Sequence, residues 1–286
     1  MFIHNQREVI GHRGTRLTAP ENTMAAMRQA AEAGVDRIEF DIRSSKDGVL
    51  RVIHDETVDR TTDGSGKISD LTSEELDRLD AGSKFDAAFQ GERIPTLGQV
   101  LDWARGTMPL NIEVKDTRPQ VRELLLAELR QHQARDFWVT SADAGFIKQL
   151  REQAPEFTTG VVVQAKPIFK KAAIAAASTA ALAAGLGLAL PVPLAAVAAG
   201  SLASGLAAGL IAKHVALDRA LAQTEGSQIL VPNASLMGRQ LDKLAAKRQQ
   251  RVFPYTVNKV DQVQKFLGLT AVGGVITDDL NFAAQA

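Results

Sequence analysis

The chain has 286 residues, of which 45% are hydrophobic and 23% are charged, a composition typical of a folded globular protein and not of a disordered one. Its 33 basic and 33 acidic residues give a formal net charge of zero, so no overall field attracts nucleic acid, which we exclude as a partner. The absence of cysteine excludes disulfides and thiolate metal sites, so a bound metal needs carboxylate, imidazole or carbonyl ligands. The first residues lack the basic start and apolar run of an export signal, which predicts a cytosolic location.

Short runs rich in β-branched residues alternate with longer helical patterns along the chain, as in parallel strands joined by crossover helices. Nine strand runs are one more than an eight-stranded barrel needs. The sequence Lys46-Asp47-Gly48 is typical of a tight turn, so either one run is an extra ribbon or the second and third strands are linked irregularly. The expected strands are Val9–Gly14, Arg37–Arg43, Leu50–Asp55, Leu110–Lys115, Phe137–Ser141, Thr158–Gln164, Gln228–Asn233, Arg251–Asn258 and Gly274–Thr277. The expected helices are Asn22–Ala33, Ser73–Leu79, Thr96–Arg105, Pro119–Gln131, Ala144–Gln153, Arg239–Gln249 and Asp261–Leu267.

Between the sixth and seventh strands an apolar segment, residues 172–212, carries no charged side chain. Without it the chain has close to the ~250 residues that are typical of one (β/α)8 barrel. We therefore expect an α/β fold, a TIM-type barrel formed by residues 1–165 and 216–286, with an apolar helical hairpin inserted at residues 166–215.

The two halves of the apolar segment, Ala172–Leu190 and Leu194–Ala212, are separated by two prolines, which cannot continue a helix. As a helix, each half approaches the ~30 Å thickness of the hydrocarbon core of a bilayer. Lysines flank both ends, which predicts a membrane anchor that holds the barrel at the cytoplasmic face of the inner or plasma membrane. The alternative is a soluble cytoplasmic protein whose hairpin packs against its copy in a homo-oligomer, since small residues spaced four apart allow close backbone approach.

Ionisable side chains recur at the carboxyl ends of the first four strand runs, where barrel enzymes keep their catalytic groups. We expect these ends to face one mouth of the barrel. The side chains are His12 and Arg13, Glu39 and Asp41, His54 and Asp55, and Glu113 and Lys115.

Two pairs of these residues are spaced two apart, Glu39 with Asp41 and Glu113 with Lys115, so each pair lies on one side of its strand. Three carboxylates at one mouth repel one another unless a cation lies between them, and oxygen ligands favour Mg²⁺ or Ca²⁺. The predicted metal ligands are therefore Glu39, Asp41 and Glu113. The alternative is a set of ordinary ion pairs, Glu113 with Lys115 and Glu39 with Arg37 or Arg43 of its own strand.

Two of the five histidines, His12 and His54, belong to this group. Imidazoles that titrate near neutral pH can take a proton from a nucleophile and return one to a leaving group. Arg13 offers a fork of donors to phosphate oxygens, and Lys115 adds a point charge. Together with a divalent cation, these groups predict the cleavage of a phosphodiester.

Short motifs follow one another in a fixed order along the chain. They are Ile10-Gly11-His12-Arg13-Gly14, Ala19-Pro20-Glu21-Asn22-Thr23, Glu39-Phe40-Asp41, Lys46-Asp47-Gly48, His54-Asp55, Asp59-Arg60-Thr61-Thr62, Pro95-Thr96-Leu97, Ile112-Glu113-Val114-Lys115, Tyr255-Thr256-Val257-Asn258 and Ile276-Thr277-Asp278. Their order and spacing resemble those of the glycerophosphodiester phosphodiesterases. The resemblance implies a barrel of the kind shared with phosphatidylinositol-specific phospholipases C, the same three metal ligands, and His12 and His54 as the acid–base pair. It also implies hydrolysis to glycerol 3-phosphate and an alcohol, through a cyclic phosphodiester formed when the glycerol 2-hydroxyl attacks phosphorus.

The same resemblance implies that Arg13 and Lys115 hold the phosphate and that Tyr255, where family members commonly carry Trp, lines the glycerol side. We expect Asn22 to cap the first helix, and we assign no role to Glu21. Because the expected hairpin follows the sixth strand at the active-site face, a close alternative is a membrane-bound phospholipase that acts on lysophospholipid or phospholipid head groups. A catalytically inactive membrane or oligomer scaffold is a weaker alternative, because every expected catalytic residue is present.

Overall fold

The structure, a computed structural model, describes residues 7–164, 222 and 224–285. The chain divides into two units, Met1–Val163 with Gly226–Ala286, and Gln164–Glu225. The predicted hairpin at 166–215 falls in the second unit and lies outside the described residues. Where the helices are described, none combines the length and the apolar character needed to cross a bilayer.

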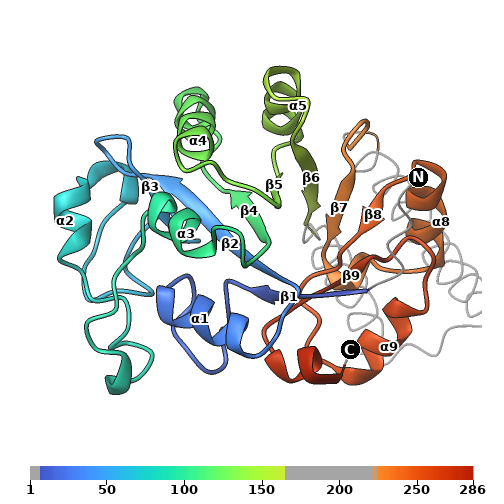
Figure 1. The fold of residues 1–286 in the computed structure, drawn as a ribbon, viewed down its shortest axis with the longest axis horizontal. Helices are drawn as coiled ribbons and strands as arrows, with labels where there is room; N and C mark the ends of the chain where they lie inside the picture. The colour runs from blue at the N-terminus through green and yellow to red at the C-terminus, as the bar shows by residue number, and fades with distance from the viewer. Residues whose placement is uncertain (1–6, 165–221, 223, 286) are drawn as a thin grey trace, which may run out of the picture. The chain divides into compact units, whose positions relative to one another are not determined.

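The first unit is built on a sheet of parallel strands. Its barrel strands are β1 (Glu8–His12), β2 (Arg37–Ser44), β4 (Leu110–Val114), β5 (Phe137–Ser141), β6 (Thr158–Val163), β7 (Ile229–Pro232), β8 (Arg251–Val252) and β9 (Gly274–Thr277). They pair in the order β8-β7-β6-β5-β4-β2-β1-β9, as Figure 1 shows. Backbone hydrogen bonds from Gly273 N to Val252 O (3.0 Å) and from Ile276 N to Pro254 O (3.0 Å) bring the two end strands together. The expected (β/α)8 barrel is thereby confirmed.

The remaining strand, β3 (Leu50–Val52), pairs with β2 in the antiparallel direction and is the extra ribbon that the sequence left open. The expectation that His54 ends a parallel barrel strand is therefore wrong. Instead, β2 extends past the mouth of the barrel, turns, and β3 carries the chain back to it. The backbone N–H of Ile53 donates to the carbonyl of Asp41 at 2.9 Å, which fixes this return beside the predicted metal ligands.

Helices follow the barrel strands and lie outside them (Figure 1). The longest of the described helices, α4, places an apolar stripe against the sheet and buries Val121, Leu125 and Leu129 at helical spacing. The first helix begins with Thr23, whose hydroxyl accepts from Ala26 N, so the prediction that Asn22 is the cap is wrong. The helices are α1 (Met24–Glu32), α2 (Ser73–Asp77), α3 (Leu97–Ala104), α4 (Pro119–Gln131), α5 (Ala144–Gln153), α8 (Arg239–Lys247) and α9 (Val260–Leu267).

A separate small core supports the loops between β3 and α3. Apolar side chains from this segment, among them Ile53, Ile68 and Ile94, pack together with little exposure to solvent. The chain makes short 3₁₀ turns here, η1 (Ile68–Asp70) and η2 (Ala87–Phe89), which the strand and helix periodicities did not predict. This core anchors the segment that carries His54, so the histidine is held on a packed structure and not on a free loop.

Candidate active site

Three carboxylates meet at the carboxyl ends of β2 and β4. Each of Glu39, Asp41 and Glu113 offers an oxygen within 4.8 Å of the others, and all three are buried. The strand register explains the meeting, because Asp41 lies directly opposite Glu113 and the two-residue spacing puts Glu39 on the same side of β2. The residues predicted as metal ligands from the sequence are therefore brought together.

The pKa values of these carboxyl groups indicate that nearby cations do not balance their negative charge. Burial, together with the charges of Asp41 and Glu113, raises the pKa of Glu39 well above its ordinary value. Burial also raises the pKa of Glu113, whereas for Asp41 the attraction of Lys115 and Arg13 outweighs burial and lowers the pKa. The Oε1 atom of Glu39 is buried without a hydrogen-bond partner. A divalent cation would satisfy this orphaned oxygen and relieve the repulsion, so the donor set fits one.

The two cations predicted to hold phosphate both contact the carboxylates. Lys115 Nζ lies 2.5 Å from Glu113 Oε1 and 3.2 Å from Asp41 Oδ1, so part of the ion-pair alternative is present in the structure. The Nε atom of Arg13 lies 3.2 Å from Asp41 Oδ2, and its backbone N–H donates to Glu39 Oε2 at 2.9 Å.

The other part of that alternative is not formed. Arg37, on the strand of Glu39, instead pairs with Glu8 at 3.1 Å and with Asp136 at 3.1 Å, and its guanidinium stacks 3.8 Å from the Trp138 ring. Glu39 therefore forms no ion pair with Arg37, and it contacts Arg13 N and His12 at the mouth of the barrel.

His12, the last residue of β1, is oriented by a carboxylate from the far end of the chain. Its Nδ1 lies 2.7 Å from Asp278 Oδ1, and Asp278 in turn accepts from Asn258 Nδ2 at 2.8 Å. With Nδ1 engaged, Nε2 points to the trio and lies 4.0 Å from Glu39 Oε2. Burial lowers the pKa of His12, and the bond to Asp278 offsets part of that effect.

His54 carries an equivalent partner. Its Nδ1 lies 2.7 Å from Asp55 Oδ1, and Arg60 Nε donates to the second oxygen of Asp55 at 2.6 Å. Burial lowers the pKa of His54, while Arg60 and His54 lower that of Asp55 to about 2. Each histidine thus has one ring nitrogen fixed by a carboxylate and the other available, the arrangement required of a proton carrier.

Glu21, which the sequence left without a role, links the two halves of this network. Its oxygens accept two bonds from Arg60, at 2.7 and 2.9 Å, and one from Arg13 at 2.7 Å. These bonds hold the pKa of Glu21 far below its ordinary value, against burial, which acts in the opposite direction. Glu21 is therefore an anion that orients Arg60 and Arg13, and Arg16 Nε also donates to it, at 3.1 Å.

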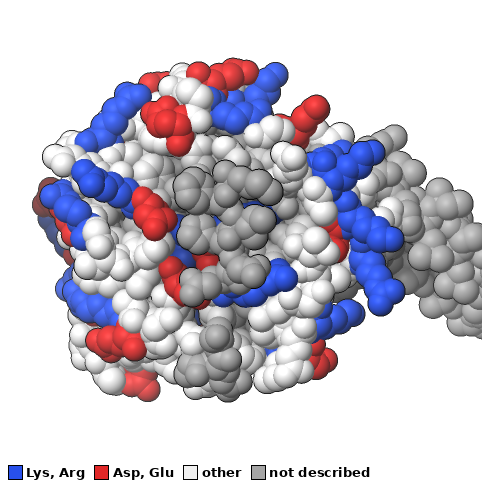
Figure 2. Space-filling model, turned by 45° about the vertical axis from the view of Figure 1, so that its right-hand side comes forward, with Lys and Arg blue, Asp and Glu red and all other residues white. Residues whose placement is uncertain are grey.

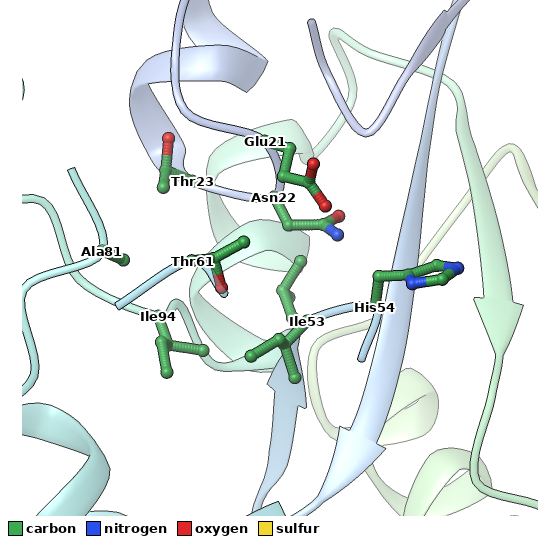
Figure 3. Close-up of a pocket in the computed structure, with 9 residues that line it drawn as sticks. Glu21, Asn22, Thr23, Ile53, His54, Thr61, Ala81 and Ile94 are labelled. Carbon is green, nitrogen blue, oxygen red and sulfur yellow. The ribbon is translucent and has the colours of Figure 1, made fainter. Parts of the chain in front are cut away.

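Asn22 is a site residue and not a helix cap. Its backbone has a φ of 60°, a left-handed conformation that asparagine tolerates better than most residues. Its Nδ2 donates to Asp41 Oδ2 at 2.9 Å and its Oδ1 accepts from Asp41 N at 3.3 Å. Figure 3 shows the side chains of Glu21 and Asn22 extending toward the side where the His54 ring lies. Asn22 therefore fixes one oxygen of the central carboxylate.

The model of the glycerophosphoryl diester phosphodiesterase family matches residues 12–281, which include all the histidines, arginines and carboxylates of the candidate active site. The chain belongs to this family. It is 41% identical over 161 residues to the glycerophosphodiester phosphodiesterase of Caldanaerobacter subterraneus subsp. tengcongensis, covering 54% of this chain and 66% of that protein. It is 47% identical over 109 residues to glycerophosphodiester phosphodiesterase 1 of Mus musculus, covering 37% of this chain and 33% of that protein. The matched stretches thus span two thirds of the length of these relatives or less.

Among solved structures, the fold resembles that of an Oleispira antarctica phosphodiesterase in complex with the product sn-glycerol-3-phosphate. The TM-score is 0.73, the identity 23%, and 98% of each chain is covered. This likeness supports the barrel fold of the family for this chain.

Tyr255, the family position where tryptophan is common, lies between β8 and α9. Its backbone N–H donates to Pro232 O at 3.0 Å, and its ring packs on the apolar cluster that includes Trp138 and Phe253. Burial and the nearby charge of Glu113 raise the pKa of its hydroxyl to about 12, so the phenol stays neutral. The structure thus places Tyr255 at the same mouth as the carboxylates.

On the face shown in Figure 2, both acidic and basic side chains reach the surface, and several basic ones follow one another along its right-hand side. The charged groups of the candidate active site form a separate, largely buried network.

Proposed function

We propose that this protein hydrolyses glycerophosphodiesters to glycerol 3-phosphate and an alcohol, with a divalent cation, Mg²⁺ or Ca²⁺, bound to Glu39, Asp41 and Glu113. The observation that carries the proposal is the pair of carboxylate-oriented histidines beside a buried trio of acids. Family membership supports it, as do the names of the relatives and the product complex of the Oleispira protein.

The two imidazoles divide the proton transfers between them. One takes the proton of the substrate's glycerol 2-hydroxyl as that oxygen attacks phosphorus, and the other donates a proton to the alcohol oxygen as its bond to phosphorus breaks. The lowered pKa of both His12 and His54 favours the neutral imidazole near neutral pH, which suits the base. The imidazole that acts as the acid takes up a proton from solvent before the alcohol leaves. The cyclic phosphodiester formed in this way is then opened by water to glycerol 3-phosphate.

Arg13 and Lys115 bind the phosphate oxygens. Both are already held by the acids of the site, so they lose little side-chain freedom when substrate arrives. A divalent cation at the three carboxylates supplies further positive charge to the phosphate as negative charge develops on it. Tyr255 forms the wall on the glycerol side, with its ring toward the apolar carbon atoms of glycerol.

A product assay tests this function. The purified protein is incubated with glycerophosphocholine, with chelator and then with Mg²⁺ or Ca²⁺ restored, and glycerol 3-phosphate and choline are both measured. We expect equal amounts of the two products, no release in chelator, and recovery with the added metal. Release of phosphocholine and glycerol instead, or full activity in chelator, would contradict the proposal.

The predicted anchoring role of residues 166–215 stays a prediction, to be tested by replacing Pro167–His214 with a short Gly/Ser linker. We expect the shortened protein to leave the membrane fraction and still to cleave glycerophosphocholine. No relative named above is a phospholipase, so we do not extend the proposal to phospholipid head groups.

A further inference from the structure

A cavity of about 250 Å³ opens beside Lys115, at the edge of the candidate active site. It is lined by residues that follow the metal-ligand strands, among them Arg43, Asp116 and Arg118, and by Glu56 and Ile68 from the loops after β3. Ile68 is the one large apolar side chain in this lining. A cavity of this polarity suits a charged or hydroxylated group and not an acyl chain.

The strand register explains why the cavity adjoins the phosphate site. Side chains at Glu39, Asp41 and Arg43 lie on one side of β2, because side chains on a strand alternate with period two. Asp41 is paired with Glu113 on β4, so the next position outward on each strand brings Arg43 beside Lys115. The cavity therefore begins two residues farther along each strand than Asp41 and Glu113.

Arg43 differs from the other charged residues of the cavity in its contacts. Arg118 makes a bidentate pair with Asp116, at 2.8 and 2.5 Å, and Glu56 pairs with Lys67 at 3.0 Å. Arg43 uses only Nε, which donates to the backbone carbonyl of His54 at 2.8 Å. Within residues 7–164 and 224–285, no carboxylate forms an ion pair with its guanidinium, so the two Nη groups keep their donors for a ligand.

From this geometry we infer that the cavity is the subsite for the leaving alcohol and that Arg43 selects alcohols carrying a negative charge, such as the carboxylate of serine. The inference rests on the proposed function. A partly buried guanidinium is the group that binds a carboxylate best, because its Nη donors match both oxygens in one plane. The hydrogen bond from Arg43 Nε to His54 O holds the guanidinium at the edge of the active site, next to one of the two histidines proposed to transfer protons.

The test compares two substrates that differ only in that carboxylate, glycerophosphoserine and glycerophosphoethanolamine. Initial rates give kcat/KM for each, in the wild type and in Arg43→Gln. We expect the wild type to favour the serine ester by about tenfold or more, and Arg43→Gln to lower kcat/KM for that ester by about 10–100-fold, mainly through KM. The ethanolamine ester should change by less than about threefold. As a control, Arg93→Gln removes an exposed arginine that bonds Leu79 O outside the cavity, and should alter neither rate.

Arg43→Lys keeps the charge without the planar fork and should retain part of the preference, which decides the matter if the glutamine variant does not fold. An equal loss on both esters would show that Arg43 acts only through His54 and would overturn the inference. So would a wild type with no preference for the serine ester. If the wild type cleaves neither ester, the proposed function itself fails, which is a different result from equal rates on both.

Discussion

Replacing Asp278 by asparagine removes the carboxylate that orients His12 and leaves the shape of the site nearly unchanged. The bond between Asp278 Oδ1 and His12 Nδ1 is 2.7 Å long and buried, as expected of a charge-assisted hydrogen bond. Such a bond contributes about 1.5–3 kcal/mol, so its loss alone predicts a fall in kcat/KM of about 10–150-fold. The new amide can also donate to Nδ1, and the imidazole proton then moves to Nε2. Because Nε2 can no longer accept a proton from the substrate, the loss in kcat/KM then approaches ~10⁴-fold.

The same substitution has a predicted effect on the pH profile. Asp278 raises the pKa of His12 against the effect of burial, so removing its charge lowers that pKa further. With His12 as the base, which must be unprotonated, the acidic limb of kcat/KM for glycerophosphocholine should move to lower pH. The matched control is Asp279→Asn, because that neighbouring carboxylate bonds Asn281 and not the histidine. Activity of Asp278→Asn within about threefold of the wild type, with an unmoved acidic limb, would refute the assigned role.

Three further predictions follow from the site and the fold. His12→Ala and His54→Ala should each lower turnover by about 10²–10⁴-fold in the glycerol 3-phosphate assay, and near-normal turnover of either would remove that histidine from the mechanism. Gly14→Ala should lower the free energy of unfolding, measured by urea titration, by about 2–4 kcal/mol. Gly14 has a φ of 76°, and a Cβ there would lie 2.7 Å from Ala26 C. An unchanged midpoint would contradict this prediction. Asp55, whose pKa falls to about 2 on folding, stabilises the protein above the ordinary aspartate pKa of ~3.9, and this stability is lost as pH falls toward 2. Asp55→Asn should therefore flatten the pH dependence of stability in that window, and an equally steep dependence would count against it.

The barrel and most of the site could be predicted because both depend on local periodicity. Parallel strands all end at one mouth, so the ionisable residues that end β1, β2 and β4 had to meet there once the strands were recognised. The spacing of Glu39 and Asp41 then placed both on one side of β2, which the register with β4 confirms. No knowledge of tertiary contacts was needed for either step.

The rest of the site depends on tertiary contacts, which local sequence patterns do not predict. His54 arrives on an antiparallel return strand, and the run Leu50–Asp55 has no feature that distinguishes it from a barrel strand. Asn22 precedes Thr23, an equally good capping residue, and only the left-handed backbone at Asn22 turns its side chain to Asp41. Arg60 and Glu21 are 39 residues apart, so their pairing requires the packed loops between β3 and α3.

Cation binding by Glu39→Gln tests most directly whether the three carboxylates form a metal site. Glu39 has the orphaned oxygen and a raised pKa, so the amide should fold, with repulsion in the trio relieved, and lose a ligand. Equilibrium dialysis against Mg²⁺ or Ca²⁺ should show saturable binding to the wild type that is lost or weakened by 100-fold or so in the variant, while its unfolding midpoint is unchanged or higher. Equal binding by a folded Glu39→Gln variant would contradict the site.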